Sequence, residues 1–318
     1  MVNTPPLRVV FFGTPSFAVP TLKALLASRH AVVAVVTQPD RPRGRGQKTS
    51  ASPVKDVAVS AAVPVVQPQS VKAAEFAAEF TAFGADIAVV AAYGQILTAP
   101  LLAAPRLGMI NVHASLLPHY RGAAPIHRAI INGDTTTGVT IMRMVKALDA
   151  GAMISAERVA IGHDETSVEL EDRLSQVGAA LLIRVLEDIA GGSVRETPQD
   201  DAAATYAPRL TKDDGVIDWS RPAVQIHNQI RGLHPWPHAV CFSGSERLIL
   251  HKSRPTSEPP ERQPGTILTA SGDRLSVATG EGTLDLLELQ SEGKRPMRVR
   301  EYLAGHPLTP GTLLHPSA

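Results

Sequence analysis

Residues 7–37 read LRVVFFGTPSFAVPTLKALLASRHAVVAVVT, and this stretch decides the fold of the first half of the chain. An apolar run from Leu7 to Phe12 ends at a glycine. Apolar side chains then recur at helical spacing from Phe17 to Ala27, and Ala31 to Thr37 is a second continuous apolar run. A strand, a helix and another buried strand in this order predict a right-handed parallel crossover, because parallel strands need a long connection.

The same alternation continues downstream. The patterns predict a helix that begins near Pro53, a strand over Val63 to Val66, a helix over Val71 to Phe83 and a strand over Asp86 to Ala91. This order is typical of α/β proteins with a doubly wound, mostly parallel sheet, whose ligands bind at the carboxyl ends of the strands. The turn Gly13-Thr14-Pro15 has one glycine only, so NAD binding is not expected.

A long helix is expected to close the first part of the chain. Apolar side chains recur at helical spacing from Thr166 to Ile189, and Gly191 with Gly192 ends the pattern. The polar segment that follows is interpreted as a linker. The sequence therefore predicts a first domain over residues 1–192 and a linker over residues 193–206.

Residues 207–318 have a different pattern, with short apolar runs broken by glycine and proline. After one predicted helix near Pro222 to Ile230, these runs are Ala239 to Phe242, Leu248 to His251, Gly265 to Leu268, Leu275 to Ala278 and Thr283 to Leu289. Several short strands at this spacing indicate a small β-barrel as the second domain.

Composition limits the classes of function. The 318 residues are 44% hydrophobic and 19% charged, which is enough to bury a core in each of two domains. No signal peptide precedes the first strand and no apolar stretch approaches about 18 residues, so a cytoplasmic protein without a membrane partner is expected. Cys241 is the only cysteine, which excludes an internal disulfide, and we expect it to be buried. With a net charge of +1, nucleic-acid binding would depend on where cations cluster.

Residues 111–122, NVHASLLPHYRG, contain the candidate catalytic side chains. They follow a predicted buried strand over Leu107 to Ile110. Because alternate side chains of a strand share a face, Asn111 and His113 would lie side by side at a strand end. Such a pair could simply satisfy loop backbone groups. A carboxylate on a tight turn downstream, Asp149, would orient the imidazole and favour its charged form, so that the three groups could stabilise an oxyanion and move a proton.

The run from Asn111 to Gly122, with Asp149 at that distance, resembles the folate-dependent formyltransferases. The flanking pieces that carry the same resemblance are Phe12 to Pro15, Thr37 to Pro42, Ala92 to Leu97, Gly122 to Ile126, Gly138 to Met142, Ile217 to Ser220 and Pro235 to Pro237. The resemblance covers nearly the whole chain. It implies a Rossmann-like formyltransferase domain followed by an oligonucleotide-binding (OB-like) barrel that binds tRNA.

The resemblance also implies a reaction. The formyl group of 10-formyltetrahydrofolate, the co-substrate, would move to the α-amine of methionine on initiator methionyl-tRNA, the step that prepares this tRNA for translation initiation. The Asn111 amide and a protonated His113 would donate to the oxyanion, and Asp149 would hold the imidazole and help to remove the amine proton. The residues implied to line the pterin pocket are Ser115, Leu116, Leu117 and Pro118. Arg121 would contact phosphate or brace the loop.

A basic loop lies between Thr37 and Pro53. Its cations are Arg41, Arg43, Arg45 and Lys48. Taken alone, a solvated charged loop is an equally good interpretation. Beside a catalytic crevice, arginines could pair with phosphates and the glycines of the loop would let the backbone come close. The resemblance implies that this insertion enters the acceptor end of tRNA, and formyltransferases acting on small substrates generally lack it.

The predicted barrel carries a second group of cations: Lys252, Arg254, Lys294, Arg295, Arg298 and Arg300. Each of them alone is best explained as a solvated surface charge. As a group they could follow a tRNA backbone, in which case added salt would weaken binding steeply.

Two other classes of function stay open. One is a formyltransferase that acts on an amino-sugar nucleotide or another small amine, and the other is a non-enzymatic nucleic-acid-binding module. No metal is expected, because His119, His127 and His163 lack the spacing of zinc ligands. Ser115 lacks the glycine-flanked turn of a serine hydrolase, so no catalytic triad is expected. We expect a monomer.

Overall fold

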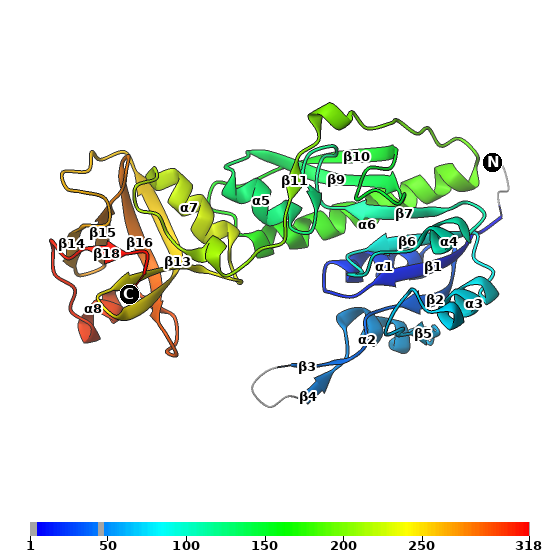
Figure 1. Cartoon of the computed structure of the whole chain (residues 1–318), viewed down its shortest axis with the longest axis horizontal. Coiled ribbons are helices and arrows are strands. Elements are labelled where there is room, and N and C mark those ends of the chain that lie inside the picture. The colour runs from blue at the N-terminus through cyan, green and yellow to red at the C-terminus, as the bar shows by residue number, and fades with distance from the viewer. Residues whose placement is uncertain (1–4, 44–47, 318) are drawn as a thin grey trace. The chain divides into compact units, whose positions relative to one another are not determined.

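The computed structural model describes residues 5–43 and 48–317, which divide into two units. Unit 1 comprises residues 1–125, 136–160 and 171–207. Unit 2 comprises residues 126–135, 161–170 and 208–318. Figure 1 shows the strands and helices of both units in the order of the chain.

Unit 1 is built on a seven-stranded sheet with the strand order β10-β9-β7-β6-β1-β2-β5. The strands that pair in parallel are β1 (Arg8–Gly13), β2 (Ala31–Val36), β5 (Val65–Val66), β6 (Ile87–Ala91) and β7 (Met109–His113). The antiparallel strands β9 (Thr136–Arg143) and β10 (Met153–Ala160) complete one edge. From β1 the chain adds strands first on one side and then on the other, which confirms the doubly wound, mostly parallel sheet.

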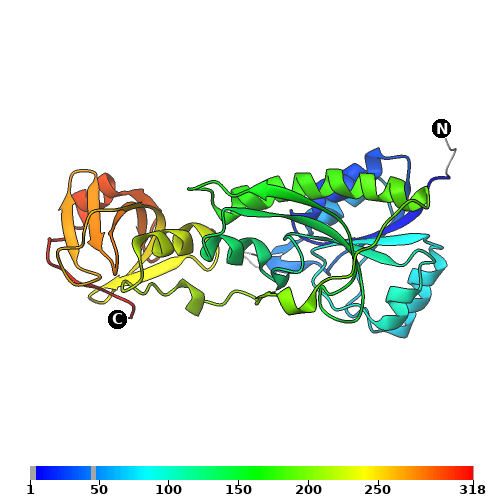
Figure 2. The same cartoon turned by 90° about the horizontal axis from the view of Figure 1, so that it is seen from above.

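Helices cover both faces of this sheet. Figure 2 shows α1 (Ala18–Ala27) and α6 (Ser167–Ala190) on one side, and α3 (Ala74–Ala82) and α4 (Ala99–Ala103) on the other. Alternation along β1 directs Val10 and Phe12 to the side of α3, where Phe12 meets the rings of Phe76 and Phe80 edge to face. Burial of these aromatic side chains stabilises that layer.

The opposite layer depends on a close approach of α6 to the sheet. A Cβ added at Gly178 would lie 2.8 Å from Val112 of β7 and 3.2 Å from Val139 of β9. Only glycine lets the helix pack at this distance. The contact fixes which face of β7 is covered, since Val112 is directed to α6.

Short elements surround the sheet of unit 1. The helix α2 (Pro53–Ser60) begins at Ser52, whose hydroxyl accepts a hydrogen bond from the backbone N–H of Lys55. A two-stranded hairpin is formed by β3 (Arg41–Arg43) and β4 (Lys48–Ser50). The strands β8 (Arg121–Gly122) and β11 (Tyr206–Ala207) pair in parallel. The helix α5 (Pro125–Ile131) belongs to unit 2 except for its first residue.

Unit 2 is an antiparallel sheet with the strand order β14-β15-β16-β13-β12-β18, and β17 pairs with β16. The bounds are β12 (Ala239–Ser243), β13 (Glu246–Thr256), β14 (Ile267–Ser271), β15 (Arg274–Ala278), β16 (Thr283–Ser291), β17 (Met297–Arg298) and β18 (Leu314–His315). Its helices are α7 (Ala223–Gly232) and α8 (Val299–Gly305), with the short 3-10 turn η2 (Asp213–Gly215) before them.

The sheet of unit 2 curls around its own core. Residues at its two edges are joined by backbone hydrogen bonds of 2.8 Å from Ile267 N to Thr312 O and from Leu314 N to Gly265 O. The enclosed core includes Ile226 of α7, Tyr302 of α8 and Cys241. Cys241 is a buried core side chain, as expected, and this burial raises the pKa of its thiol to about 12. An α/β domain followed by a small curled β domain is therefore confirmed.

The two units differ in three segments from the domains predicted from the sequence. Segments 126–135 and 161–170 belong with unit 2. In the second segment, the carbonyls of Gly162 and Glu165 accept hydrogen bonds from Arg231 of α7. Segment 193–206, interpreted as a linker, belongs to unit 1, where Thr197 and Met153 exchange backbone hydrogen bonds of 2.8 Å. The edge strand β10 was also not predicted from the sequence. It is largely half-exposed, so its apolar and polar side chains do not alternate clearly.

Within the described residues, no helix has both the length and the apolar character that crossing a membrane requires.

Candidate active site

The carboxyl ends of β1, β6 and β7 meet at one edge of the sheet in unit 1, and the strand order reverses between β1 and β6. Hydrogen bonds join the loops that follow β1, β2 and β6. Thr14 Oγ1 donates to the carbonyl of Tyr93 at 3.0 Å and accepts from the backbone N–H of Gln38 at 3.3 Å. The edge is therefore a fixed rim of the kind at which doubly wound sheets bind ligands.

Asn111 and His113 end the strand β7 on the same face. In the antiparallel register with β9, Asn111 lies opposite Met142 and His113 lies opposite Thr140. Val112 between them is directed to α6, so the amide and the imidazole point away from that helix. The His113 residue is 5% exposed, and Asn111 is half-buried. The strand geometry thus places Asn111 and His113 on one face of β7, as predicted from their spacing.

Asp149 lies beside His113, although 36 positions separate them in the sequence. Its Oδ2 is 3.7 Å from His113 Nδ1. The other ring nitrogen, Nε2, is 3.0 Å from the carbonyl oxygen of Tyr120. A carbonyl only accepts, so Nε2 carries a proton, and in the doubly protonated ring both N–H groups face an oxygen. The distance of 3.7 Å from His113 Nδ1 to Asp149 Oδ2 exceeds hydrogen-bond length, so the Nδ1–H group can donate to another acceptor that lies beside Asp149.

The turn that carries Asp149 is held from two directions. The backbone N–H of Gly122 donates to Asp149 Oδ2 at 2.9 Å. The Gln199 side-chain amide donates to the carbonyls of Asp149 and Gly151 at 2.7 and 2.8 Å. Asp149 has φ +47°, a conformation that is uncommon for a residue with a side chain, and such conformations concentrate at functional sites. The carboxylate is therefore positioned by the fold.

Arg121 braces this turn. The residue is 3% exposed, and its guanidinium donates to Gln199 Oε1 at 3.0 and 2.8 Å and to Asp201 Oδ1 at 2.7 Å. Arg121 was expected either to contact phosphate or to brace the loop, and its buried guanidinium fits the second role. Sequence reasoning missed Gln199, because it lies in the segment interpreted as a linker and no local pattern marks it.

The loop after β7 is fixed by Thr140 of β9. The Thr140 hydroxyl donates to the carbonyl of Ser115 at 2.7 Å and accepts from the backbone N–H of Leu117 at 3.2 Å. The Ser115 hydroxyl donates to the carbonyl of His119 at 2.6 Å, so it braces the loop as well. Leu116 and Pro118 are half-buried, and Leu117 is buried. The assignment of these four loop residues to the pterin pocket stays a prediction.

The basic loop is the hairpin of β3 and β4. Arg41 is exposed and pairs in register with Ser50, and Arg43 pairs with Lys48. Arg45 lies outside the described residues. The one acid of this loop, Asp40, bonds at 2.6 Å to Lys55 of α2. That hydrogen bond holds the pKa of the Asp40 carboxyl below its usual range, so the acid is ionised and paired with a residue outside the loop.

The cations of unit 2 are partly balanced by acids. Lys252 Nζ lies 3.7 Å from Glu288 Oε2, and Arg295 bonds to Glu301 at 3.3 Å. Arg254 lies opposite Asp285 in the register of β13 and β16. A contribution of these cations to tRNA binding stays a prediction.

This chain is similar to known proteins over most of its length. Residues 7–186 match the family model described as formyl transferase, and residues 209–307 match that of the formyl transferase C-terminal domain. A methionyl-tRNA formyltransferase of Moorella thermoacetica is 46% identical over 308 residues, which are 97% of this chain and 99% of that protein. A methionyl-tRNA formyltransferase of Citrifermentans bemidjiense is 48% identical and covers 97% of this chain and 96% of its own length.

Solved structures share the fold at lower identity. The crystal structure of an N-formyltransferase from Helicobacter canadensis, in complex with folinic acid and dTDP-3-aminofucose, has a TM-score of 0.69 at 19% identity. The match covers 90% of this chain and 99% of that one. At this identity the likeness concerns the fold alone.

Proposed function

The chain belongs to the formyl transferase family, and from this premise we propose that it transfers a formyl group from 10-formyltetrahydrofolate to the α-amine of methionine on initiator methionyl-tRNA. The observation that carries the proposal is the placement of Asp149 3.7 Å from His113 at the rim of the sheet, in a chain 46–48% identical to methionyl-tRNA formyltransferases over 97% of its length. The product would be N-formylmethionyl-tRNA for translation initiation.

Two observations support a folate co-substrate: the ligand-binding edge of the sheet in unit 1, and the solved structures that share this fold. The N-formyltransferase from Helicobacter canadensis was solved with folinic acid, and a related sugar formyltransferase structure contains a formylated tetrahydrofolate. A planar pterin needs apolar walls with a few placed hydrogen bonds. Leu116, Leu117 and Pro118 would supply apolar surface from a loop that Thr140 holds in place.

In the proposed mechanism, the amine attacks the formyl carbon and forms a tetrahedral intermediate with a negatively charged oxygen. The Asn111 side-chain amide and the His113 Nδ1–H are the donors for that oxygen, because both lie at the end of β7 on the face that is turned away from α6. Collapse of the intermediate breaks the bond to the folate nitrogen, which takes up the proton that the amine has lost, and the products are the formylated amine and tetrahydrofolate.

Asp149 acts through charge and position. Its carboxylate lies 3.7 Å from His113 Nδ1 and orients the imidazole, and it can accept the proton that the attacking amine loses. An α-amine has a pKa of about 8 in peptides, so part of it is already neutral at pH 7 and a strong base is not needed. Stabilisation of the oxyanion is therefore the larger contribution.

A second candidate substrate is an amino-sugar nucleotide. The solved complex with dTDP-3-aminofucose belongs to a protein of the same fold, and the chemistry at the formyl carbon would be the same. The sequence identity to methionyl-tRNA formyltransferases is more than twice that to the sugar enzyme. The basic hairpin of β3 and β4 also favours an acceptor with phosphates.

The deciding experiment compares acceptors. Purified protein with 10-formyltetrahydrofolate is given methionyl-tRNA in one reaction and a dTDP-linked amino sugar in another, and formylated product is measured. Formylation of methionyl-tRNA at a kcat/KM at least about 100-fold higher is expected, since a site built for one acceptor discriminates by this order. The reverse preference would assign the chain to small amines, and no formylation of either acceptor would remove the proposal.

A further inference from the structure

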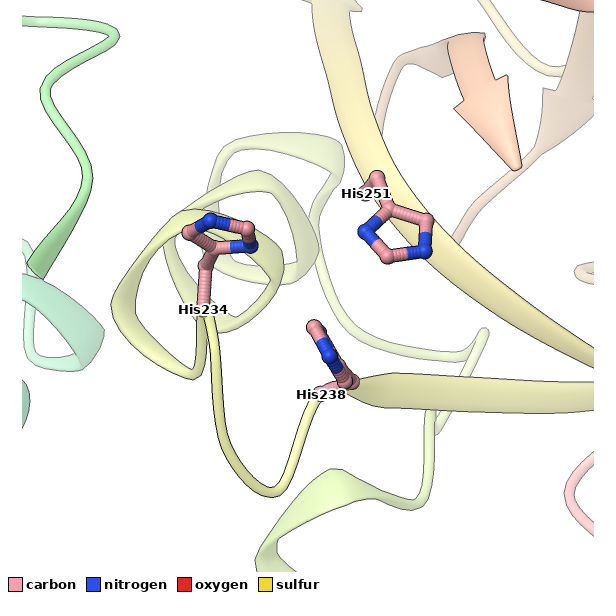
Figure 3. Close-up of side chains that lie close together, drawn as sticks. All are labelled: His234, His238 and His251. Atoms are coloured by element: carbon pink, nitrogen blue, oxygen red, sulfur yellow. The ribbon is translucent and has the colours of Figure 1, made fainter. Parts of the chain in front are cut away.

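Three histidines of unit 2 gather at one point, apart from the residues discussed so far. His234 follows the C-cap of α7, His238 directly precedes β12, and His251 belongs to β13. One ligand nitrogen from each ring can be chosen so that all three lie within 4.8 Å of one another. Figure 3 shows the three rings around a common space, each carried by a different segment of the chain.

The fold explains why the rings meet. In the antiparallel pairing of β12 and β13, Ala239 lies opposite Leu250, so one step further along the same register places His238 beside His251. Their ring centroids are 4.8 Å apart. The backbone N–H of His238 donates to the carbonyl of Leu233 at 3.0 Å, and this bond folds the intervening loop back and returns His234 to the pair.

Two of the rings have a nitrogen that the protein leaves without a partner. Nδ1 of His234 and Nδ1 of His238 are buried, and no residue within the ranges 5–43 and 48–317 forms a hydrogen bond to either atom. A buried polar atom in this state needs an explanation, because most such atoms are satisfied by protein or by ordered solvent.

The third ring is oriented like a metal ligand. His251 Nε2 lies 2.8 Å from Gln290 Oε1, and the same amide donates through Nε2 to the carbonyl of Lys294 at 2.6 Å. The amide orientation is therefore defined, so Gln290 presents its oxygen and His251 Nε2 must carry the proton. The lone pair of His251 is then on Nδ1. A hydrogen bond to the outer nitrogen is the usual arrangement of a metal-bound histidine.

We propose that His234, His238 and His251 bind a divalent transition-metal ion, Zn²⁺ in the first place, through three imidazole nitrogens with a fourth position open to water. Imidazole is a preferred ligand of Zn²⁺, and three histidines with an open position form a recognised zinc set. Zinc–nitrogen bonds of about 2.0–2.1 Å in a tetrahedron place the ligand nitrogens about 3.4 Å apart. Side-chain rotations that shorten the present nitrogen–nitrogen distances, which are within 4.8 Å, by at most about 1.4 Å would therefore form the site.

The charges around the rings agree with ligation. Burial, together with the neighbouring His251 and His234, lowers the pKa of His238 to about 4, and burial also lowers the pKa of His234. These two rings are thus neutral at pH 7, which is the form that binds a metal. The charged groups near the cluster are Glu169 of α6, Glu288 of β16, and Arg247 and Lys252 of β13, the strand that also carries His251.

A second histidine group in unit 2 does not have these properties. His163, Asp164 and His227 also lie within reach of one ion. Both ring nitrogens of His227 have protein partners, however, at 3.1 Å to Ser253 Oγ and 3.3 Å to the His163 carbonyl, and the other two side chains are exposed. This group provides a matched control within the same unit.

Sequence reasoning did not consider these residues for a metal. The expectation of no metal rests on His119, His127 and His163, none of which is in the cluster. The spacing His234-x3-His238 was the available signal, but the intervening Pro-Trp-Pro excludes the helix on which such a spacing usually brings two ligands together.

The test measures zinc retained by the full-length protein without an affinity tag. The protein is stripped with a chelator, incubated with equimolar Zn²⁺, desalted and assayed by elemental analysis. We expect about one zinc per chain in the wild type and in H163A, and a loss of at least about tenfold in H238G. Glycine is chosen because residue 238 has φ +67°, which glycine adopts without strain.

Two further measurements separate ligation from misfolding. In Co²⁺-loaded protein, the visible bands of a tetrahedral ion should be present in the wild type and absent in H238G. The variant Q290M, which keeps all three ligands but removes the bond to His251 Nε2, should bind Zn²⁺ about 10-fold to 100-fold more weakly. Equal zinc contents in the wild type and H238G would overturn the proposal, as would an equal loss in H163A and H238G.

Discussion

His113 in unit 1 and His238 in unit 2 are the same side chain in two different settings. His113 has a carbonyl oxygen at Nε2 and a carboxylate beside Nδ1, so both nitrogens face acceptors. His238 has two imidazoles for neighbours, and its Nδ1 is buried without a partner among the described residues. The first setting suits a ring that holds and moves a proton, whereas the second suits a ring that offers a lone pair. The neighbours, and not the residue type, decide the chemistry.

The largest effect is expected from removing the proton-bearing ring. Replacing His113 by Ala should reduce kcat for methionyl-tRNA formylation by about 10²–10³, because one donor to the oxyanion is lost. Replacing Asn111 by Ala should have an effect of the same order. Affinity for the tRNA, measured by filter binding, should change little, and H163A serves as the control. Near-normal turnover of H113A would remove His113 as a donor to the oxyanion.

A smaller loss is expected when the Asp149 turn is released. Gln199→Leu removes the two side-chain hydrogen bonds to the carbonyls of Asp149 and Gly151. The carboxylate is then less well positioned, and kcat should fall by about tenfold, since a misplacement of about 1 Å can cost up to about 100-fold. Combined with H113A, the same substitution should cost little more, because both act on one charge pair. Additive losses would separate Gln199 from the His113 site.

The cations of unit 2 are partly balanced by acids, and salt dependence compares them with the basic loop. Arg45→Ala in the basic loop should flatten the slope of log Kd against log salt for tRNA by about one unit, as expected for one lost phosphate contact. Lys252→Ala should change the slope less, because Lys252 already lies 3.7 Å from Glu288. If the slope of log Kd against log salt is unchanged in R45A, the loop is best explained as a solvated charged surface.

The smallest effect concerns a histidine that is neither catalytic nor in the proposed metal set. Burial lowers the pKa of His227 below 6.5, so the folded ring is neutral while the unfolded ring takes up a proton below pH 6.5. Stability should therefore be fully present above pH 6.5 and fall as the pH drops from there toward the folded pKa, by at most about 1.4 kcal/mol per pH unit. Urea unfolding of H227N should show a shallower dependence between pH 7.5 and 5. Equal slopes would mean that this ring is protonated in the folded protein.

Much of the fold was readable because it depends on local patterns. Buried runs and helical spacing over residues 7–91 gave the parallel crossovers, since each element hides one face and its period shows in the sequence. Placing Asn111 and His113 on one face needed only the two-residue period of a strand. The edge strand β10 was missed, because half-exposed strands show no clear alternation.

Contacts between distant segments were decided by the tertiary structure. The sequence offered Asp149 as a candidate, but its 3.7 Å approach to His113 depends on the antiparallel pairing of β7 and β9. The support from Gln199 and the meeting of His234, His238 and His251 depend on sheet register and on how loops fold back, which no local period encodes. The sequence thus determined which groups were available and which faces they share, and only the packed sheets determined which of them meet.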